Sequence, residues 1–234
     1  MSAEESVLVA GVGPGLGIAL ARRFAREEYR VAMLARSRDR LAALAAQAPE
    51  LLVPMPCDVT DPAQVNAAFE ETERQLGPLA CAIFNAGAYR RGSILDIAPD
   101  DFEHCWRVGA FAGFLVGQAA AKRMVARGSG TILFTGETAS LRGGANFVNL
   151  ASPKFALRAV AQSMARELGP RGIHVAHIII DGQIGGAAGG DDDTRAPDSK
   201  LAPDAIAETY LNLHRQHRSA WSQEIDLRPS VERF

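Results

Sequence analysis

Short apolar runs alternate with longer segments of helical period along most of the chain. The runs are rich in Val, Ile and Leu and lack polar alternation, which is typical of parallel strands covered on both faces. They are Ser6–Ala10, Arg30–Ala35, Leu79–Phe84, Thr131–Phe134, His174–Ile180 and Gln223–Leu227. The segments of helical period are Ile18–Glu28, Asp61–Leu76, Gly109–Val125, Phe155–Leu168 and Pro203–His217. This alternation predicts an α/β fold of Rossmann type, a doubly wound parallel sheet of about seven strands with helices on both faces.

No repeat or shift in composition divides the 234 residues into two parts, so we expect a single domain over residues 1–234. One segment differs from the rest. Gly185–Lys200 contains pairs of glycines, three consecutive aspartates and no apolar period, which predicts a surface loop. Together with the helical segment that follows, residues 185–217 form a candidate lid over a substrate site.

The charge balance and the apolar pattern exclude several classes of protein. The chain has 25 Lys and Arg against 27 Asp and Glu, so it lacks the basic excess of a nucleic-acid binder. No apolar run is long enough to cross a bilayer, and the first residues are acidic where a signal peptide is basic. The cysteines Cys57, Cys81 and Cys105 have no metal-ligand spacing. We expect a cytoplasmic protein with no membrane or nucleic-acid partner and no metal site.

A glycine-rich turn, AGVGPGLG, follows the first apolar run and leads into the first helical segment. Glycines permit a tight turn whose backbone N–H groups approach a pyrophosphate, and the start of the helix adds partial positive charge. A turn required only for packing a strand against a helix is the alternative interpretation. The position after the first strand favours a dinucleotide site, with candidate contacts at Gly11, Gly13, Gly15, Leu16 and Gly17.

The end of the second apolar run indicates which dinucleotide binds. A site selective for NAD places Asp or Glu there, about 20 residues past the glycines, to bind the ribose hydroxyls. Here that position holds Arg36, followed by Ser37. Arg36 can pair with a 2′-phosphate, and Ser37 can donate a hydrogen bond to it. The alternative interpretation is a solvated basic turn that caps the next helix. The pair favours NADP(H) over NAD(H).

This ordered set of motifs resembles the classical short-chain dehydrogenase/reductase family over nearly the whole chain. The glycine turn is similar to the family's spaced glycine signature, with Ala10 in the place of Thr. Asp58 and Val59 match the family's adenine-contacting pair. The motif that lines the family's cofactor cleft is matched by Asn85, Ala86 and Gly87.

The resemblance continues in the second half of the chain. Lys154 takes the place of the family's Lys, which binds the nicotinamide ribose, and Ile184 takes that of the residue touching the carboxamide. The resemblance implies a nicotinamide-dependent oxidoreductase with a small-molecule substrate. It also implies a homodimer or homotetramer, formed through two alanine-rich helices.

The catalytic positions depart from the family's pattern. Its Asn, Ser and Tyr correspond to Gly109, Glu137 and Leu150, so only Lys154 is retained. A positioned acid or base contributes typically about 10²–10⁴-fold to such a reaction, and leucine has no proton to give. Glu137 is the candidate replacement, provided that an apolar pocket favours its protonated form. It can equally form an inert ion pair with Lys154, and a shift of the alignment by one residue would place Thr138 at the serine position.

Two functions of different classes follow from these residues. The first is an NADP(H)-dependent oxidoreductase acting on a small carbonyl, alcohol, enone or imine, with Lys154 and Glu137 as its catalytic residues. The second is a catalytically silent dinucleotide-binding protein that serves as a cofactor sensor or as the oligomer partner of an active relative. A shared fold does not decide between them.

Overall fold

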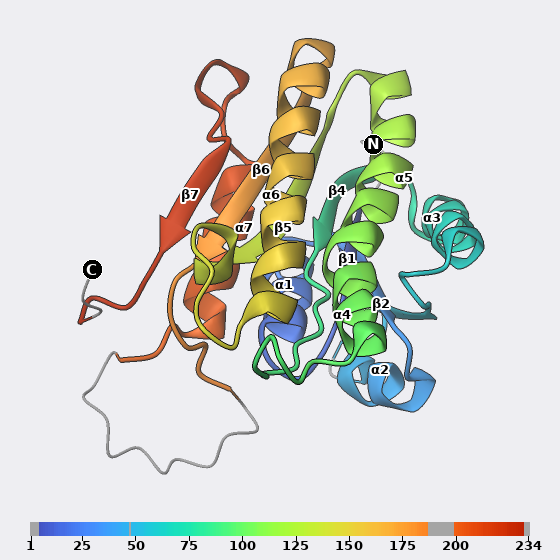
Figure 1. Cartoon of the computed structure of the whole chain (residues 1–234). Helices are drawn as coiled ribbons and strands as arrows, with labels where there is room; N and C mark the ends of the chain where they lie inside the picture. Colours follow the sequence, from blue (N-terminus) through green and yellow to red (C-terminus); the bar gives the residue numbers. More distant parts are fainter. Residues whose placement is uncertain (1–4, 47, 187–198, 232–234) are drawn as a thin grey trace.

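A seven-stranded parallel sheet runs through the molecule in the order β3-β2-β1-β4-β5-β6-β7 (Figure 1). The structure is a computed structural model that describes residues 5–46, 48–186 and 199–231. The strands are β1 (Ser6–Ala10), β2 (Arg30–Ala35), β3 (Leu52–Pro56), β4 (Leu79–Phe84), β5 (Gly130–Glu137), β6 (Ile173–Ile180) and β7 (Glu224–Leu227). The strand order reverses between β1 and β4, which confirms the predicted doubly wound sheet and places a crevice at the carboxyl ends of these two strands.

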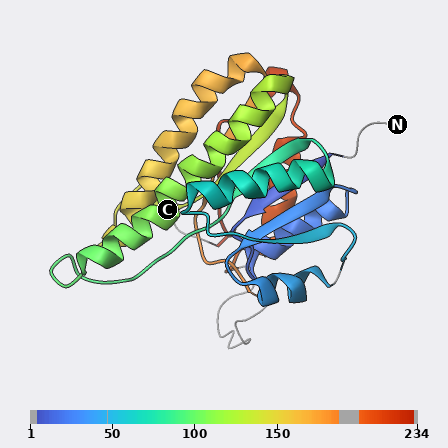
Figure 2. The same ribbon diagram turned by 90° about the vertical axis from the view of Figure 1, so that its right-hand side faces the viewer.

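Helices cover both faces of the sheet. They are α1 (Leu16–Ala25), α2 (Arg38–Ala45), α3 (Pro62–Leu76), α4 (Pro99–Trp106), α5 (Ala112–Arg127), α6 (Val148–Leu168) and α7 (Pro203–His214). Helices α3, α5 and α6 pack on one face, and α1 and α7 pack together on the other (Figures 1 and 2). A π-helical turn, Arg107–Phe111, joins α4 to α5.

The alternation of side chains along each strand divides the core into two layers. In β1, Val7 and Val9 face the layer under α1 and α7, whereas Leu8 and Ala10 face the layer under α3, α5 and α6. All four side chains are fully buried. Strands covered on both faces bury every position, so they appear in the sequence as continuous apolar runs.

Local signals explain where the helices begin and end. The Asp61 carboxylate accepts hydrogen bonds from the amides of Ala63 and Gln64 at 2.8 and 3.3 Å, which caps α3. The Ser37 hydroxyl accepts from the Arg40 amide and caps α2 in the same way. Gly77 ends α3 at a φ of 93°, a conformation that favours glycine.

Strand β3 and the bounds of α6 and α7 are among the features that differ from the sequence expectation. Strand β3 was not predicted, because its sequence LVPMP contains two prolines; it lies at an edge of the sheet, where missing N–H donors are tolerated. Helix α6 begins at Val148 and contains Pro153 in its second turn, whereas the apolar period predicted a start at Phe155. Helix α7 ends at His214 rather than His217.

The segment expected to form a lid is described in part. Residues 187–198 lie outside the described residues. Helix α7 packs against α1, with Ile206, Tyr210 and Leu211 fully or almost fully buried in the core. A lid formed by residues 185–217 therefore stays a prediction, and its helix is anchored in the core. Within the described residues, none of the helices combines the length and apolar character that crossing a membrane requires.

Candidate active site

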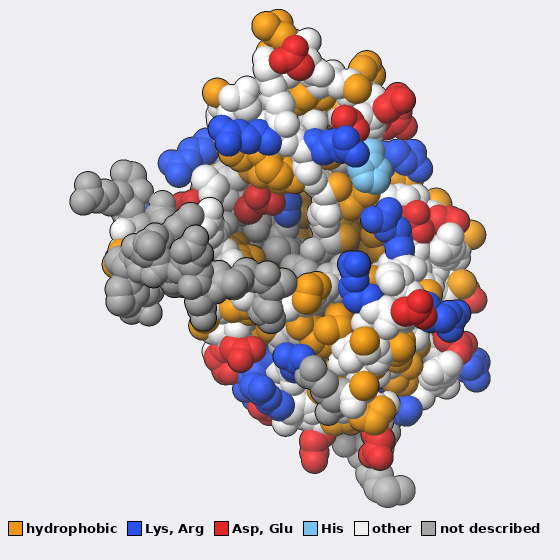
Figure 3. All heavy atoms as spheres, turned by 90° about the horizontal axis from the view of Figure 1, so that it is seen from below, with side chains coloured by type: hydrophobic (Ala, Val, Ile, Leu, Met, Phe, Trp, Pro, Cys, Tyr) orange, Lys and Arg blue, Asp and Glu red, His pale blue; other side chains and the backbone are white. Residues whose placement is uncertain are grey.

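Two cavities adjoin at the carboxyl edge of the sheet. We name them after the roles that the sequence analysis expects of their lining residues: the adenosine cavity, of about 800 Å³ near β2 and α2, and the catalytic cavity, of about 640 Å³ near β5, β6 and α6. Asn85 and Gly87 line both of them. Figure 3 looks onto this edge and shows it hollowed, with Lys and Arg side chains along its rim. The two cavities share these two lining residues and lie side by side at the crevice where the strand order reverses.

The glycine turn and the motif after β4 are locked to each other. The side-chain amide of Asn85 donates to the Gly11 carbonyl at 3.0 Å, and the Asn85 backbone amide donates to Ala10 at 2.8 Å. Gly11 has a φ of 99°, and a Cβ there would lie 2.4 Å from the Ala86 nitrogen. A Cβ on Gly17 would lie 2.6 Å from the Gly11 carbonyl oxygen. Packing alone therefore requires glycine at these two positions.

Packing does not explain the other two glycines. A Cβ on Gly13 or Gly15 would meet no atom of the described residues within 4 Å, and Gly13 lines the adenosine cavity. Gly15 precedes α1 without a side-chain cap, so the first amides of this helix have no side-chain acceptor there. The protein's own packing does not require glycine at these two positions, and they lie at a helix start that no side chain caps. This combination fits a turn that leaves room for an anion.

Basic and hydroxyl groups line the outer end of the adenosine cavity. Arg36 and Ser37 follow β2, and Arg40 lies one turn further on in α2. Sequence reasoning missed Arg40, although its spacing of three residues from Ser37 is the signal of a shared helix face. All three side chains are exposed, so an incoming anion displaces only solvent from them.

Asp58 and Val59 line the same cavity, as predicted for neighbours of the adenine. The Asp58 carboxylate accepts from the Thr60 amide at 2.9 Å and from the Thr60 hydroxyl at 2.7 Å, and these bonds lower the pKa of Asp58. Burial raises the pKa of the adjacent Cys57 thiol to about 11, so this thiol stays neutral and is a poor nucleophile at neutral pH.

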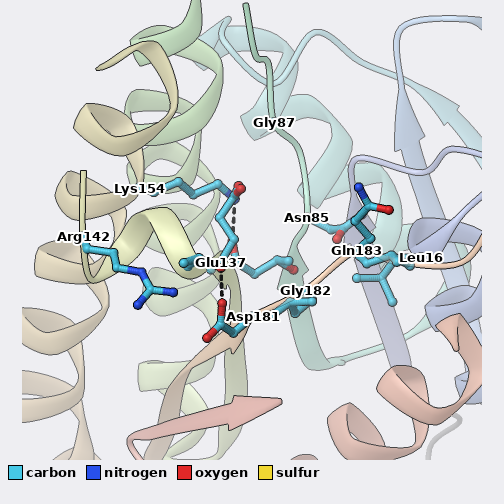
Figure 4. A pocket seen from close by; sticks show the side chains of 14 residues that line it. Leu16, Asn85, Gly87, Glu137, Arg142, Lys154, Asp181, Gly182 and Gln183 are labelled. Carbon is cyan, nitrogen blue, oxygen red and sulfur yellow. Dashed lines mark hydrogen bonds and ion pairs between the residues drawn. The ribbon is translucent and has the colours of Figure 1, made fainter. Parts of the chain in front are cut away.

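Lys154 enters the catalytic cavity from α6 (Figure 4). Its ammonium donates to the Thr135 carbonyl at 2.9 Å and lies 3.1 Å from a carboxylate oxygen of Glu137. The Lys154 side chain is only 8% exposed, and that of Glu137 is 31% exposed. The ion pair foreseen as one of the two alternatives for Glu137 is therefore present, at the surface of the cavity.

The Glu137 carboxylate also has a local structural role. Glu137 ends β5 and caps the 3₁₀ turn Thr138–Ser140, accepting from the Ser140 backbone while the Ser140 hydroxyl accepts from the Glu137 amide at 3.2 Å. These reciprocal hydrogen bonds fix the conformation of the 3₁₀ turn and the position of the Glu137 carboxylate. Glu137 is thus held between its own cap and the Lys154 ammonium.

A second polar pair lies beside the first. The Thr138 hydroxyl donates to the Asp181 carboxylate, and Arg228 lies 3.3 Å from the other carboxylate oxygen. Asp181 directly follows β6, is only 8% exposed and lines the catalytic cavity. Sequence reasoning missed this pairing, for which an acid at the carboxyl end of a buried strand was the only signal.

The residues that the sequence analysis aligned with the family's Asn and Tyr, Gly109 and Leu150, are packed or apolar. Gly109 is buried in the π-helical turn, where a Cβ would lie 2.8 Å from the Pro153 Cβ of α6. Leu150 lies one turn before Lys154 on α6, and among the described residues it is not part of the cavity lining. None of the three tyrosines of the chain lines the cavity either.

Two histidines of β6, His174 and His177, are not part of the lining of the catalytic cavity. Burial lowers the pKa of His177 to about 4, so the ring is neutral at physiological pH. Its Nδ1 lies 3.1 Å from Glu224, which Arg158 binds through two hydrogen bonds of 2.6 Å. His174 stacks on Trp221. Within the described part of the chain, no group of three or more His, Cys, Asp or Glu is arranged to hold a metal.

Comparison with known proteins identifies the family. A family profile described as short chain dehydrogenase matches residues 5–183. The 3-oxoacyl-[acyl-carrier-protein] reductase MabA of Mycobacterium avium is 31% identical over 203 residues, which cover 87% of this chain and 74% of that relative. The chain belongs to the short-chain dehydrogenase family. A 2-(S)-hydroxypropyl-CoM dehydrogenase of Xanthobacter autotrophicus is 29% identical over 74% of this chain and 69% of its own length.

Solved structures agree with this assignment. A short-chain dehydrogenase from Rhodopseudomonas palustris is 38% identical, with a TM-score of 0.83 over 97% of this chain and 99% of its own. An alcohol dehydrogenase from Thermococcus sibiricus, complexed with 5-hydroxy-NADP, shares the fold at 24% identity and a TM-score of 0.85, over 98% of this chain and 99% of its own. The short-chain dehydrogenase fold binds a nicotinamide dinucleotide, and its members are oxidoreductases. In this short-chain dehydrogenase, the cleft of two adjoining cavities lies at the dinucleotide crevice of the fold.

Proposed function

We propose that this short-chain dehydrogenase is an NADP(H)-dependent oxidoreductase that acts on a small carbonyl, alcohol, enone or imine. The shared lining of the two adjoining cavities carries the proposal. At one end Arg36, Ser37 and Arg40 offer cations and a hydroxyl, and at the other end Lys154 and Glu137 offer groups that bind and move protons. The shared lining at Asn85 and Gly87 allows one extended ligand to reach both ends.

The residues present fit this cofactor along its whole length. The open Gly13, the other glycines of the turn and the uncapped start of α1 suit a pyrophosphate. Arg36 and Ser37 would hold the 2′-phosphate, with Arg40 beside them. The adenine would lie against Asp58 and Val59. The nicotinamide end would be held by Asn85, Ala86, Gly87, Lys154 and Ile184, of which all but Ala86 line the catalytic cavity.

The bound cofactor supplies or accepts the hydride, and this chain's own residues handle the charge and the proton. Lys154 places a positive charge where the substrate oxygen becomes negative, which favours the alkoxide. Glu137 accepts the hydroxyl proton when the substrate is oxidised and returns one proton to the oxygen when it is reduced. Because Glu137 is partly exposed, it exchanges that proton with solvent.

One observation favours the silent alternative. Glu137 is held by Lys154 and by its own cap, and Leu150 replaces the tyrosine with a side chain that carries no proton. A catalytically silent dinucleotide-binding protein would keep the adenosine cavity and lose turnover. The two functions therefore differ in their chemistry and share their ligand.

Glu137→Gln tests the proposal. Glutamine keeps the shape and can still accept the cap, but it cannot take a proton, so we expect hydride transfer to be abolished while NADPH binding persists. Fluorescence titration of NADPH measures binding, and cofactor absorbance with a panel of carbonyl compounds measures turnover. Glu73→Gln is the matched control, because Glu73 is 34% exposed and lies 3.1 Å from Arg123 in a similar ion pair away from the cleft.

The outcomes separate the two functions. Wild-type binding without turnover of any compound supports the silent protein. Turnover that Glu137→Gln leaves unchanged removes the role given to Glu137. Absence of NADPH binding to the wild-type protein overturns both functions.

We also propose that the protein is a homodimer or homotetramer. Large aromatic side chains remain exposed on α4, α5 and α6, and the exposed fractions of Trp106, Phe114 and Phe155 are 39%, 41% and 44%. Clustered exposed apolar residues on adjoining helices are typical of a subunit interface. A monomeric mass in solution, measured by light scattering, would contradict this proposal.

A further inference from the structure

Some of the charged side chains that line the catalytic cavity have an ion-pair partner, and one has none among the described residues. Among the described residues, two acids and two bases line it: Glu137, Asp181, Lys154 and Arg142. Glu137 is paired with Lys154, and Asp181 is paired with Arg228 and accepts a hydrogen bond from Thr138. Both acids of the wall are therefore satisfied by the protein itself.

Arg142 differs from the other three. Its backbone amide donates to the Thr138 carbonyl at 3.2 Å, which fixes the start of the side chain just after the 3₁₀ turn. Its guanidinium forms no hydrogen bond or ion pair with any described residue. Figure 4 shows this side chain reaching from the wall into the cavity, on the side of Glu137 and Asp181. The catalytic cavity thus contains a cation that none of the described residues neutralises.

The phosphates of the cofactor do not account for this cation. They belong at the glycine turn and at Arg36, which line the adenosine cavity, whereas Arg142 lines only the catalytic cavity. A guanidinium presents two parallel N–H donors that match a carboxylate. Glu137 and Asp181 lie in the same wall and repel additional negative charge, so a monoanion suits the cavity better than a dianion.

We propose that Arg142 binds a carboxylate of the substrate, so that this enzyme reduces short oxo acids or oxidises the corresponding hydroxy acids. This inference rests on the proposed function and names the substrate class of the same cavity. Arg142 anchors the carboxylate, and the carbonyl of the same molecule then lies toward Lys154 and Glu137. Arg142 is a specificity determinant, and it takes no part in moving the hydride or the proton.

The test compares oxo acids with their methyl esters. The purified full-length protein is given NADPH and a series of short oxo acids that differ in the spacing between carbonyl and carboxylate, each paired with its methyl ester. We expect kcat/KM for the best acid to exceed that of its ester by about tenfold or more, the range of a charge-assisted hydrogen bond. Arg142→Gln should remove this difference, mainly through KM, and leave the ester unchanged. Arg142→Lys should restore part of it, because lysine keeps the charge without the paired donors.

Arg91→Gln is the matched control. Arg91 is also an exposed arginine, its guanidinium lies 5.6 Å from the centre of the Phe147 ring, and it is not part of the lining of the catalytic cavity. This variant should keep the preference for acids. Equal rates for acids and esters in the wild-type protein would overturn the inference. So would an equal loss with acid and ester in Arg142→Gln, or an equal loss of preference in Arg91→Gln.

Binding measurements distinguish this inference from the proposed function. If the wild-type protein does not bind NADPH, the proposed function fails, and the inference fails with it. If the protein binds NADPH but turns over no compound, the acids and esters are titrated into the NADPH-loaded protein and followed by NADPH fluorescence. Tighter binding of the acid that is lost in Arg142→Gln supports the carboxylate site, and equal binding of acid and ester overturns it.

Discussion

The two halves of the cleft differ in how far their polar groups are already paired. In the adenosine cavity, Arg36 and Arg40 are exposed, and Gly13 faces open space that the protein does not fill. In the catalytic cavity, by contrast, Lys154 is paired with Glu137 and Thr138 with Asp181. The first half has groups free to meet a ligand, and most groups of the second half meet one another.

This difference shows that binding and chemistry are separable within one fold. On the catalytic side, Lys154 has both an ion pair with Glu137 and a carbonyl acceptor at Thr135, and Gly109 fits closely against Pro153.

Gly11→Ala is expected to have the largest effect, because it breaks the adenosine half. Alanine at a φ of 99° is strained, and its Cβ would meet backbone atoms of Ala86 at 2.4 Å. We expect loss of NADPH binding by about 100-fold or more, or a protein that does not fold, since neither backbone can move without breaking β1 or β4. Thermal unfolding and NADPH titration measure both effects.

Gly13→Ala is the matched comparison for Gly11→Ala. A Cβ at Gly13 would meet no described atom within 4 Å, so the thermal stability should be unchanged while NADPH binding weakens. A Gly13→Ala protein that binds NADPH as tightly as the wild type would show that no ligand approaches this turn. The difference between the two cavities would then lose its functional meaning.

The sequence was sufficient to predict the fold and many of the residues that line the adenosine cavity. Continuous apolar runs identified β1, β2 and β4 with their observed bounds, because buried parallel strands leave this signal. The glycine turn and Arg36 could be placed because they lie at the ends of those strands. Contacts within one strand–turn–helix unit are local, so spacing along the chain is enough to find them.

The pairing within the catalytic half could not be predicted to the same extent. Thr138 and Asp181 lie 43 residues apart and meet only because β5 and β6 are neighbours with a particular register. From the sequence, Glu137 could be either an acid that carries a proton or the ion-pair partner of Lys154. Which of the two forms depends on the turn that Glu137 caps, and spacing along the chain does not give the geometry of that turn. The clash that requires glycine at position 109 is set by the crossing of α6 over the π-helical turn, which leaves no sequence signal.

Gly109→Ala should have an intermediate effect, on the free energy of unfolding. It tests whether the residues around the catalytic cavity fit one another closely. Replacing glycine by alanine inside a helix normally stabilises it by about 0.5–1 kcal/mol. Here the new Cβ would lie 2.8 Å from the rigid ring of Pro153, so we expect a net loss of about 1–3 kcal/mol in the free energy of unfolding. Denaturant unfolding measures it, with Gly169→Ala as the control without close neighbours. A stabilised Gly109→Ala protein would mean that Gly109 and Pro153 are not a fitted pair.

Arg36→Gln should have the smallest effect, because Arg36 is exposed and Ser37 and Arg40 would also bind the 2′-phosphate. A solvent-exposed cation gives about 1.4 kcal/mol to a phosphate, so we expect NADPH to bind about tenfold more weakly and NADH to bind unchanged. Arg38→Gln is the matched control, since Arg38 is also exposed and, among the described residues, does not line the adenosine cavity. Equal losses for NADPH and NADH, or equal losses in the two variants, would show that Arg36 adds only general positive charge. The selectivity of the adenosine half would then have to come from Ser37 and Arg40, and the double variant with Arg40→Gln would locate it.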